Sequence, residues 1–101
     1  MTLKRLPPVD GELAEAKAYY DAINADLGAR LYDEFVRALR LIERFPQGWH
    51  PLGGELRQCR LKTFPYAVIY AVVHDDIVVL AFANTHRRPG YWRDRIGSAL
   101  Q

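Results

Sequence analysis

Residues 66–84 read YAVIYAVVHDDIVVLAFAN, and this stretch decides the fold. Residues 66–73 and 77–84 are apolar on both faces, which is typical of central strands that are covered on both sides. The short HDD between them favours a tight hairpin turn. The stretch therefore predicts two neighbouring strands at the centre of a sheet.

The residues before this hairpin predict a third strand. LRQCRLK, residues 56–62, alternates imperfectly between apolar and polar side chains. Because residues two apart share a face of a strand, we expect Arg60 and Lys62 to project together and Arg57 to project oppositely. PQGWHPLGGE, residues 46–55, is rich in Pro and Gly and predicts a loop that Trp49 anchors on the core.

The N-terminal half predicts one strand and two helices. TLKRL opens the chain as a short strand, which two prolines stop. Apolar residues at three- and four-residue steps predict an amphipathic helix over residues 11–26, capped by Asp10 and broken by Gly28. A second apolar stripe predicts a helix that runs to Phe45 and stops at Pro46; its members are Leu31, Phe35, Ala38, Leu39 and Ile42.

The predicted fold class is α+β, with the order β–α–α–β–β–β in a single domain over residues 1–101. An N-terminal αα-hairpin packs on one face of a small, mainly antiparallel twisted sheet, and the first strand joins at an edge. We expect Pro89 and Gly90 to end the last strand. YWRDRIGSAL, residues 91–100, then forms one or two helical turns.

Composition excludes several classes of protein. Half of the 101 residues are hydrophobic, enough for one core, and no apolar run approaches the roughly 20 residues that cross a bilayer. The lone Cys59 has no disulfide partner within the chain, which favours a reducing cytoplasm and an inert buried thiol. The sequence has no CxxC pair and no glycine-rich phosphate loop, so we expect neither a metal nor a cofactor.

Charge is distributed unevenly along the chain, although the formal net charge is only +2. Residues 1–55 hold seven Lys and Arg against nine Asp and Glu, a net of −2, and residues 56–101 hold seven against three, a net of +4. The basic half points to a polyanion or an acidic partner. Ordinary solvated charge is the alternative explanation.

Cations and aromatics gather in NTHRRPGYWRDR, residues 84–95. The usual motifs for a nucleophile or a metal-activated water are missing, so this segment is the main candidate for chemistry. RNA cleavage would need a base, an acid and cations at the phosphate. Lys62 or His86 would be the base, Tyr91 or His86 the acid, and the arginines would stabilise the phosphate.

A structural role for the same residues is the alternative. Arg and Lys at strand edges are commonly just solvated, and His86 can serve as a hydrogen-bonded residue of the fold or as a partner contact. Tyr91 and Trp92 would pack the terminal segment against the sheet, and Asp94 would pair with a neighbouring arginine. Tyr66 and Tyr70, two residues apart, are expected in the core rather than on a stacking platform.

Several motifs in one order resemble a known family. These are YY in the first helix, LG between the helices, RFP at the end of the second, PLGG before the sheet, FPYAVIY in it and HRRPGYW at the end. Together they resemble the RelE/ParE superfamily of toxins from bacterial type II toxin–antitoxin modules, over nearly the whole chain. The resemblance implies a small cytoplasmic toxin that a cognate antitoxin neutralises in a hetero-oligomer, away from any membrane.

The resemblance implies two possible targets. The RelE-like branch cuts mRNA on the ribosome, and Arg60, Lys62, Arg87 and Tyr91 fall roughly where that branch carries its working residues, with His86 as a further candidate. The lysine cluster typical of that branch is missing, whereas FPY and RRPGYW look like plasmid-stabilisation, ParE-type members. We therefore expect a ParE-like inhibitor of DNA gyrase that is held by a ParD-like ribbon-helix-helix antitoxin.

Two alternatives stay open beside the gyrase inhibitor: a ribosome-dependent endoribonuclease, and a non-toxic family member that only binds an antitoxin. For all three, one set of residues is expected to contact the partner or target: Arg57, Arg60, Lys62, His86, Arg87, Arg88 and Tyr91.

Overall fold

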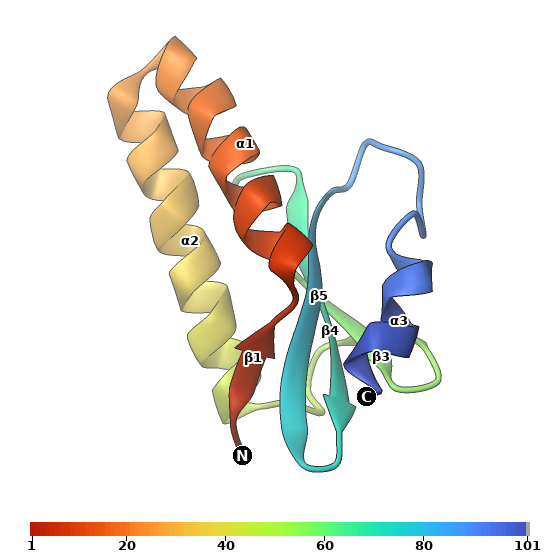
Figure 1. Cartoon of the computed structure of the whole chain (residues 1–101). Helices are drawn as coiled ribbons and strands as arrows, with labels where there is room; N and C mark the ends of the chain where they lie inside the picture. Colours follow the sequence, from red (N-terminus) through yellow and green to blue (C-terminus); the bar gives the residue numbers. More distant parts are fainter. Residues whose placement is uncertain (101) are drawn as a thin grey trace.

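The computed structural model describes residues 1–100 and has an αα-hairpin against a twisted sheet (Figure 1). The elements are β1 (Leu3–Arg5), α1 (Pro7–Ile23), α2 (Ala25–Arg44), β2 (His50–Gly53), β3 (Leu56–Arg60), β4 (Tyr66–Val73), β5 (Asp76–Asn84), the 3₁₀ helix η1 (Arg93–Arg95) and α3 (Ile96–Ala99).

The sheet has five strands in the order β1-β5-β4-β3-β2. Strand β1 runs parallel to β5 at one edge, and the other neighbours are antiparallel. This confirms the α+β class, the central hairpin and the first strand at an edge. The prediction of a plain loop over residues 46–55 was incomplete, because β2 pairs with β3 there. Pro51 is tolerated in β2 because an edge strand can leave one side of its backbone unpaired.

Helix α1 begins earlier than predicted. It starts at Pro7, its N-cap is Leu6 without a side-chain hydrogen bond, and Asp10 lies in the first turn. The predicted Asp10 cap was therefore wrong. A proline fits the first helical position because its missing N–H has no helical partner there, so the prolines that stop β1 also start α1.

The break between the helices lies at Asn24, and the prediction that Gly28 breaks the helix was wrong. Asn24 is extended, and its side-chain oxygen accepts a hydrogen bond from Asp26 N at 2.8 Å, which caps α2. Gly28 is a buried residue inside α2. A Cβ placed on it would lie 1.7 Å from Asp21 Oδ1 and 3.2 Å from Lys17 O. The glycine thus lets α1 and α2 approach closely.

Both faces of the central strands are covered. The αα-hairpin buries one face. There the rings of Phe35 and Phe82 pack edge to face, with their centres 5.1 Å apart. The C-terminal segment packs on the other, with Trp92 and Ala99 buried against residues such as Ile69. The predicted terminal helical turns are confirmed. The last strand ends at Asn84, as the apolar run over residues 77–84 predicted, and so stops before the expected break at Pro89 and Gly90.

Three further predictions about the core are confirmed. Tyr66 and Tyr70 are buried, so they form no exposed platform. Trp49 is half-buried on the core, and its indole Nε1 donates to Leu41 O at 3.3 Å. Cys59 is buried, and burial raises the pKa of its thiol to about 11. The thiol therefore stays protonated and unreactive near neutral pH.

Candidate interaction site at the end of β5

Three hollows meet where β5 ends, and Asn84 and Arg87 line all of them. The chain turns sharply here because Asn84 accepts two local hydrogen bonds. Its side-chain oxygen accepts from His86 N at 2.9 Å, and its backbone oxygen accepts from Arg87 N at 3.2 Å. The turn sends residues 86–90 away from the sheet before Tyr91 returns to it.

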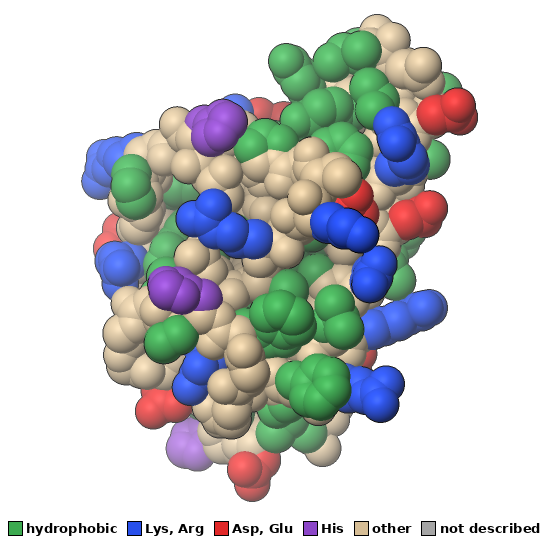
Figure 2. Space-filling view, turned by 180° about the vertical axis from the view of Figure 1, so that it is seen from behind, with side chains coloured by type: hydrophobic (Ala, Val, Ile, Leu, Met, Phe, Trp, Pro, Cys, Tyr) green, Lys and Arg blue, Asp and Glu red, His purple; other side chains and the backbone are tan. Residues whose placement is uncertain are grey.

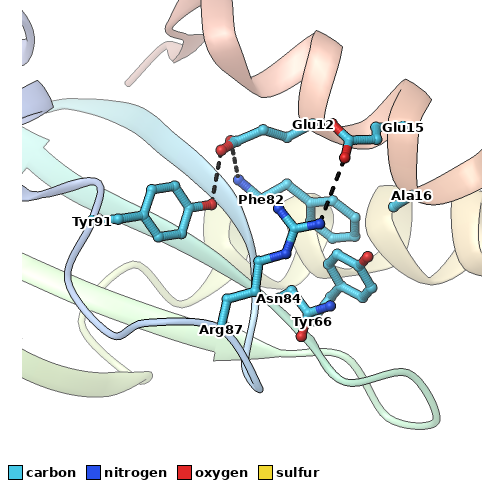
Figure 3. Close-up of a pocket in the computed structure, with 8 residues that line it drawn as sticks. All are labelled: Glu12, Glu15, Ala16, Tyr66, Phe82, Asn84, Arg87 and Tyr91. Carbon is cyan, nitrogen blue, oxygen red and sulfur yellow. Dashed lines mark hydrogen bonds and ion pairs between the residues drawn. The ribbon is translucent and has the colours of Figure 1, made fainter.

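The first hollow, of about 120 Å³, lies between α1 and the end of β5 (Figure 3). In this view the Arg87 side chain lies between the rings of Tyr91 and Tyr66, and its guanidinium points towards Glu15. Arg87 Nη2 is 3.6 Å from Glu15 Oε1, and both side chains are mostly exposed. Such an exposed pair contributes little to stability, so Arg87 can exchange this contact for one with a partner.

Glu12 ties α1 to two other parts of the fold. Its carboxylate accepts from Phe82 N at 3.0 Å, from the Tyr91 hydroxyl at 2.8 Å and from Arg95 Nη1 at 3.0 Å. Figure 3 shows the first two contacts. The side chain of Glu12 is only 19% exposed, so charge-assisted bonds of this kind are stronger than those on an open surface.

A bulge in β5 explains why these contacts form. The pairing of β4 with β5 shifts at Leu80, which is the extra residue between Val79 and Ala81. Arg95 Nη1 donates to Leu80 O at 3.0 Å, next to its bond with Glu12. Side chains thus satisfy the β5 edge beyond the point where β1 stops.

Tyr91 is a structural residue in this arrangement. Burial raises the pKa of its phenol, and the hydrogen bond to Glu12 raises it further. A phenol that holds its proton so firmly is poorly suited to protonate a leaving group near neutral pH.

The second hollow is an aromatic groove of about 710 Å³ between α1 and the end of the sheet. Tyr19, Tyr20 and Tyr66 line it, with His86 and Arg87 at the side formed by the turn after β5. The ring of Tyr20 packs edge to face on the ring of Phe64, with the two ring centres 4.9 Å apart. The groove combines aromatic rings with His86 and Arg87, and Glu15 of α1 also lines it.

The third hollow, which we call the arginine hollow, has a volume of about 270 Å³ and lies on the sheet face that carries the C-terminal segment. Arginines from β3, from the turn after β5 and from η1 line it: Arg60, Arg87, Arg88 and Arg93. Its lining contains no Asp or Glu.

The predicted functional residues are divided among these places. Arg60, Arg87, Arg88 and Tyr91 line the arginine hollow, whereas His86 lines the aromatic groove. The predicted faces of β3 need one correction, because the strand ends at Arg60 and Lys62 lies beyond it. Arg57 and Lys62 lie elsewhere.

Arg57 lies under the loop before the sheet. Its Nη1 donates to Trp49 O at 2.8 Å, on the opposite face from Arg60, as predicted. Lys62 lines a separate hollow of about 160 Å³ beside Glu34 of α2, which Arg60 also borders. No one of these hollows is therefore lined by all the candidates for RNA cleavage.

Glu12 and Arg95 are the residues that sequence reasoning missed. The prediction that Asp94 pairs with a neighbouring arginine is not met. Among residues 1–100, Arg95 pairs with Glu12 and Asp94 forms no ion pair. The sequence holds no local signal for a contact between residues 83 positions apart.

A family comparison decides the class of this protein. The model of the family described as "ParE toxin of type II toxin-antitoxin system, parDE" matches residues 4–89. The chain belongs to the ParE toxin family. It is thus a toxin of the type II toxin–antitoxin class, as the motifs predicted.

The fold of this ParE-family chain is also similar to a solved structure titled "Chromosomal ParDE TA system from P. aeruginosa". The match has a TM-score of 0.68 at 15% identity and covers 85% of this chain and 97% of the other. At that identity the likeness concerns the fold. Comparison with curated protein sequences gave no significant match.

Residues 1–100 of this ParE-family toxin show neither a membrane-spanning helix nor a cluster of metal ligands. None of their helices is both long enough and apolar enough to span a membrane. They also contain no group of three or more His, Cys, Asp or Glu side chains placed to hold a metal ion.

Proposed function

We propose that this ParE-family toxin inhibits DNA gyrase and is neutralised by direct binding of a cognate, ParD-like ribbon-helix-helix antitoxin. The family match over residues 4–89 carries the toxin class. The contact of Tyr91 with Glu12 supports an activity other than RNA cleavage, because it holds one of the two candidates for the general acid, Tyr91, in a structural hydrogen bond.

The αα-hairpin offers a surface for the antitoxin. Tyr19 and Ile23 lie four residues apart on α1 and are 64% and 61% exposed. Hydrophobic side chains gather on the tip of the hairpin, at the upper right of Figure 2. An amphipathic helix can lay its apolar face on such a surface, and Tyr19 connects it directly to the aromatic groove.

The edge of β5 offers a second contact. Among residues 1–100, β1 pairs with β5 only at residues 77–79. Thr85 N donates to Pro65 O, so Phe82 and Asn84 turn their backbone groups away from β4. Glu12 already accepts from Phe82 N, and Asn84 O already accepts from Arg87 N. An extended antitoxin segment can therefore bond here only to the remaining groups, Phe82 O and Asn84 N, with acidic side chains facing His86 and Arg87.

Co-purification tests the antitoxin surface. We expect the toxin to co-purify with the protein encoded in the adjacent reading frame, and Tyr19→Glu to weaken that complex by at least about tenfold. The matched control is Phe45→Glu, because Phe45 is also an exposed apolar residue of this hairpin region, 51% exposed, but lies at the other end of α2. If Tyr19→Glu and Phe45→Glu bind the antitoxin equally well, the antitoxin does not bind at the Tyr19 surface.

Supercoiling by purified gyrase tests the target. We expect the free toxin to inhibit the reaction and equimolar antitoxin to restore it. Expression of the toxin alone should induce the DNA-damage response and leave mRNA intact. Codon-mapped mRNA cleavage with unaffected gyrase would instead identify an endoribonuclease, and normal growth would identify a non-toxic antitoxin-binding protein.

A further inference from the structure

The hollow of about 160 Å³ between α2 and β3, which we call the α2–β3 hollow, lies away from the proposed antitoxin surface. Strand β4 separates β3 from β5, whereas the aromatic groove lies between α1 and the end of the sheet. The accessible apolar surface of the hollow comes from Leu41 of α2 and from Trp49, which are both half-buried. The buried residues Ala38, Cys59 and Leu61 form its closed floor.

The apolar wall is fixed before any ligand arrives. Trp49 Nε1 donates to Leu41 O at 3.3 Å, and Arg57 Nη1 donates to Trp49 O at 2.8 Å. Because these two contacts hold the indole and its backbone in place, a ligand that packs on this wall orders few side chains. The entropic cost of binding is correspondingly low.

The charged residues around the α2–β3 hollow are mainly cations. Arg37, Arg60 and Lys62 line it and are exposed. The one acid in the lining, Glu34, already accepts from Thr63 N at 3.1 Å and from the Thr63 hydroxyl. Within residues 1–100, no carboxylate lies within 4.0 Å of the cationic groups of Arg37, Arg60 or Lys62. Three cations against one engaged carboxylate favour an acidic ligand.

The edge of β3 beside this hollow is unpaired. Leu61 N donates to Tyr66 O at 2.9 Å, so the alternation of an antiparallel pair turns the backbone groups of Arg60 away from β4. Strand β2 does not reach them, because its pairing with β3 begins at His50 opposite Gln58. Within residues 1–100, the N–H and C=O of Arg60 therefore form no backbone hydrogen bond. Such an edge is a template for another strand.

We propose that the α2–β3 hollow binds an extended acidic segment of a protein partner other than the antitoxin, and that this segment adds as a strand at Arg60. Backbone hydrogen bonds with Arg60 hold the segment against the edge. Because side chains alternate along a strand, the residue opposite Arg60 lies beside the Arg60 side chain and its two neighbours face α2. One neighbour is apolar and packs on Leu41 and Trp49. Carboxylates at the other two positions meet Arg60 and Arg37.

The antitoxin and the acidic segment can occupy one toxin molecule together. This part of the assignment rests on the proposed function, which puts the antitoxin on α1 and on the edge of β5. Strand β4 lies between that edge and β3, so a short segment at Arg60 leaves the antitoxin in place. The preference for an acidic segment depends only on residues of the α2–β3 hollow.

Fluorescence anisotropy with a labelled peptide, Thr-Glu-Glu-Leu-Glu-Glu-Thr, tests the assignment. The peptide offers a leucine followed or preceded by two glutamates, so it fits either strand direction. Purified toxin should bind it at least about fivefold more tightly than the same peptide with serine in place of leucine. N-methylation of the leucine's two neighbouring glutamates removes backbone donors and should weaken binding at least about fivefold.

A pair of variants on α2 tests the place of binding. Arg37→Glu should weaken binding at least about fivefold, because it replaces an attraction by a repulsion. Arg37→Gln, which only removes the charge, should weaken it about threefold. The matched control is Arg30→Glu, since Arg30 is also exposed on α2 but does not line the hollow. It should change affinity less than twofold.

Several results would overturn the assignment. Equal binding of the serine peptide, or equal losses in Arg37→Glu and Arg30→Glu, would show general charge attraction only. An N-methylated peptide that binds as well as the original would exclude strand addition. Loss of peptide binding in the purified toxin–antitoxin complex would make the antitoxin the occupant. Self-association of the toxin that Arg37→Glu abolishes, without peptide binding, would make it a second copy of this chain.

Discussion

At the scale of single residues, Glu12 contributes most to the order of the candidate site. Its carboxylate joins α1 to the backbone of β5 and to Tyr91 and Arg95 of the C-terminal segment. Because the group is mostly buried, removing it leaves donors without partners, and that costs more than losing a surface contact.

We expect Glu12→Ala to lower the free energy of unfolding by about 2 kcal/mol, because it leaves the Phe82 N–H and the Arg95 guanidinium unsatisfied. Urea unfolding followed by circular dichroism measures this value. Glu15→Ala is the control, since the Glu15 side chain is 73% exposed. A Glu12 variant as stable as this control would contradict the structural role of the carboxylate.

The raised pKa values of two tyrosines predict that the folded protein becomes less stable at alkaline pH. Burial raises the pKa of Tyr70 to about 12, and burial with the Glu12 contact raises the pKa of Tyr91. Both phenols stay protonated in the folded state at a pH where the unfolded chain releases these protons. Their contribution is therefore complete below the ordinary tyrosine pKa near 10 and is lost as pH rises towards about 12.

We expect Tyr91→Phe to make the free energy of unfolding less dependent on pH in the alkaline range. Urea unfolding at about pH 9 and about pH 11, on either side of the usual tyrosine pKa, measures the difference. The wild type should lose more stability over this interval than the variant. Parallel profiles would show that Tyr91 is not protonated preferentially in the fold.

At the scale of elements, the join between α1 and α2 depends on Asn24 rather than on a glycine. Asn24 N donates to Tyr20 O to finish α1, and its side chain caps α2. The same residue thus ends one helix and begins the next.

We expect Asn24→Ala to destabilise the fold by about 1 kcal/mol, the usual cost of losing an N-cap. Asn24→Asp keeps an acceptor at this position and should restore most of the stability. Thermal unfolding compares the two variants. A loss in both would indicate that the extended backbone at this residue matters more than the cap.

At the scale of the whole molecule, the sheet is stabilised from both sides. The αα-hairpin covers one face, and the C-terminal segment covers the other through Trp92 and Ala99. Strands β4 and β5 contribute residues to both layers. We therefore propose that the chain unfolds as a single domain.

We expect Trp92→Ala to destabilise the protein by about 3 kcal/mol, because the ring is 5% exposed and its loss opens the second layer. Far-ultraviolet circular dichroism and tyrosine fluorescence should report one shared transition at a lower temperature. Ser98→Ala, an exposed change in α3, is the control. Two separate transitions would show that the layers unfold independently.

The sequence alone determined the strands and helices whose signals are local. The apolar runs of β4 and β5, the stripe of α2 and the turn at HDD all follow from periodicity and turn chemistry. The motifs around them were sufficient for the family as well. Two weaker patterns led to wrong predictions. The Pro- and Gly-rich composition of residues 46–55 predicted a loop where β2 forms, and Gly28 was predicted to end a helix although it lies inside α2 where α1 packs closely.

Only the tertiary structure decided how the C-terminal residues are used. It brought Glu12 to Tyr91 and Arg95, sent His86 to the aromatic groove, and gathered Arg60 with Arg87, Arg88 and Arg93 around one hollow. These contacts join segments far apart in the chain. Hydrophobic periodicity specifies which face of an element is buried, but the bulge in β5 and the crossing of α1 determine which side chains meet.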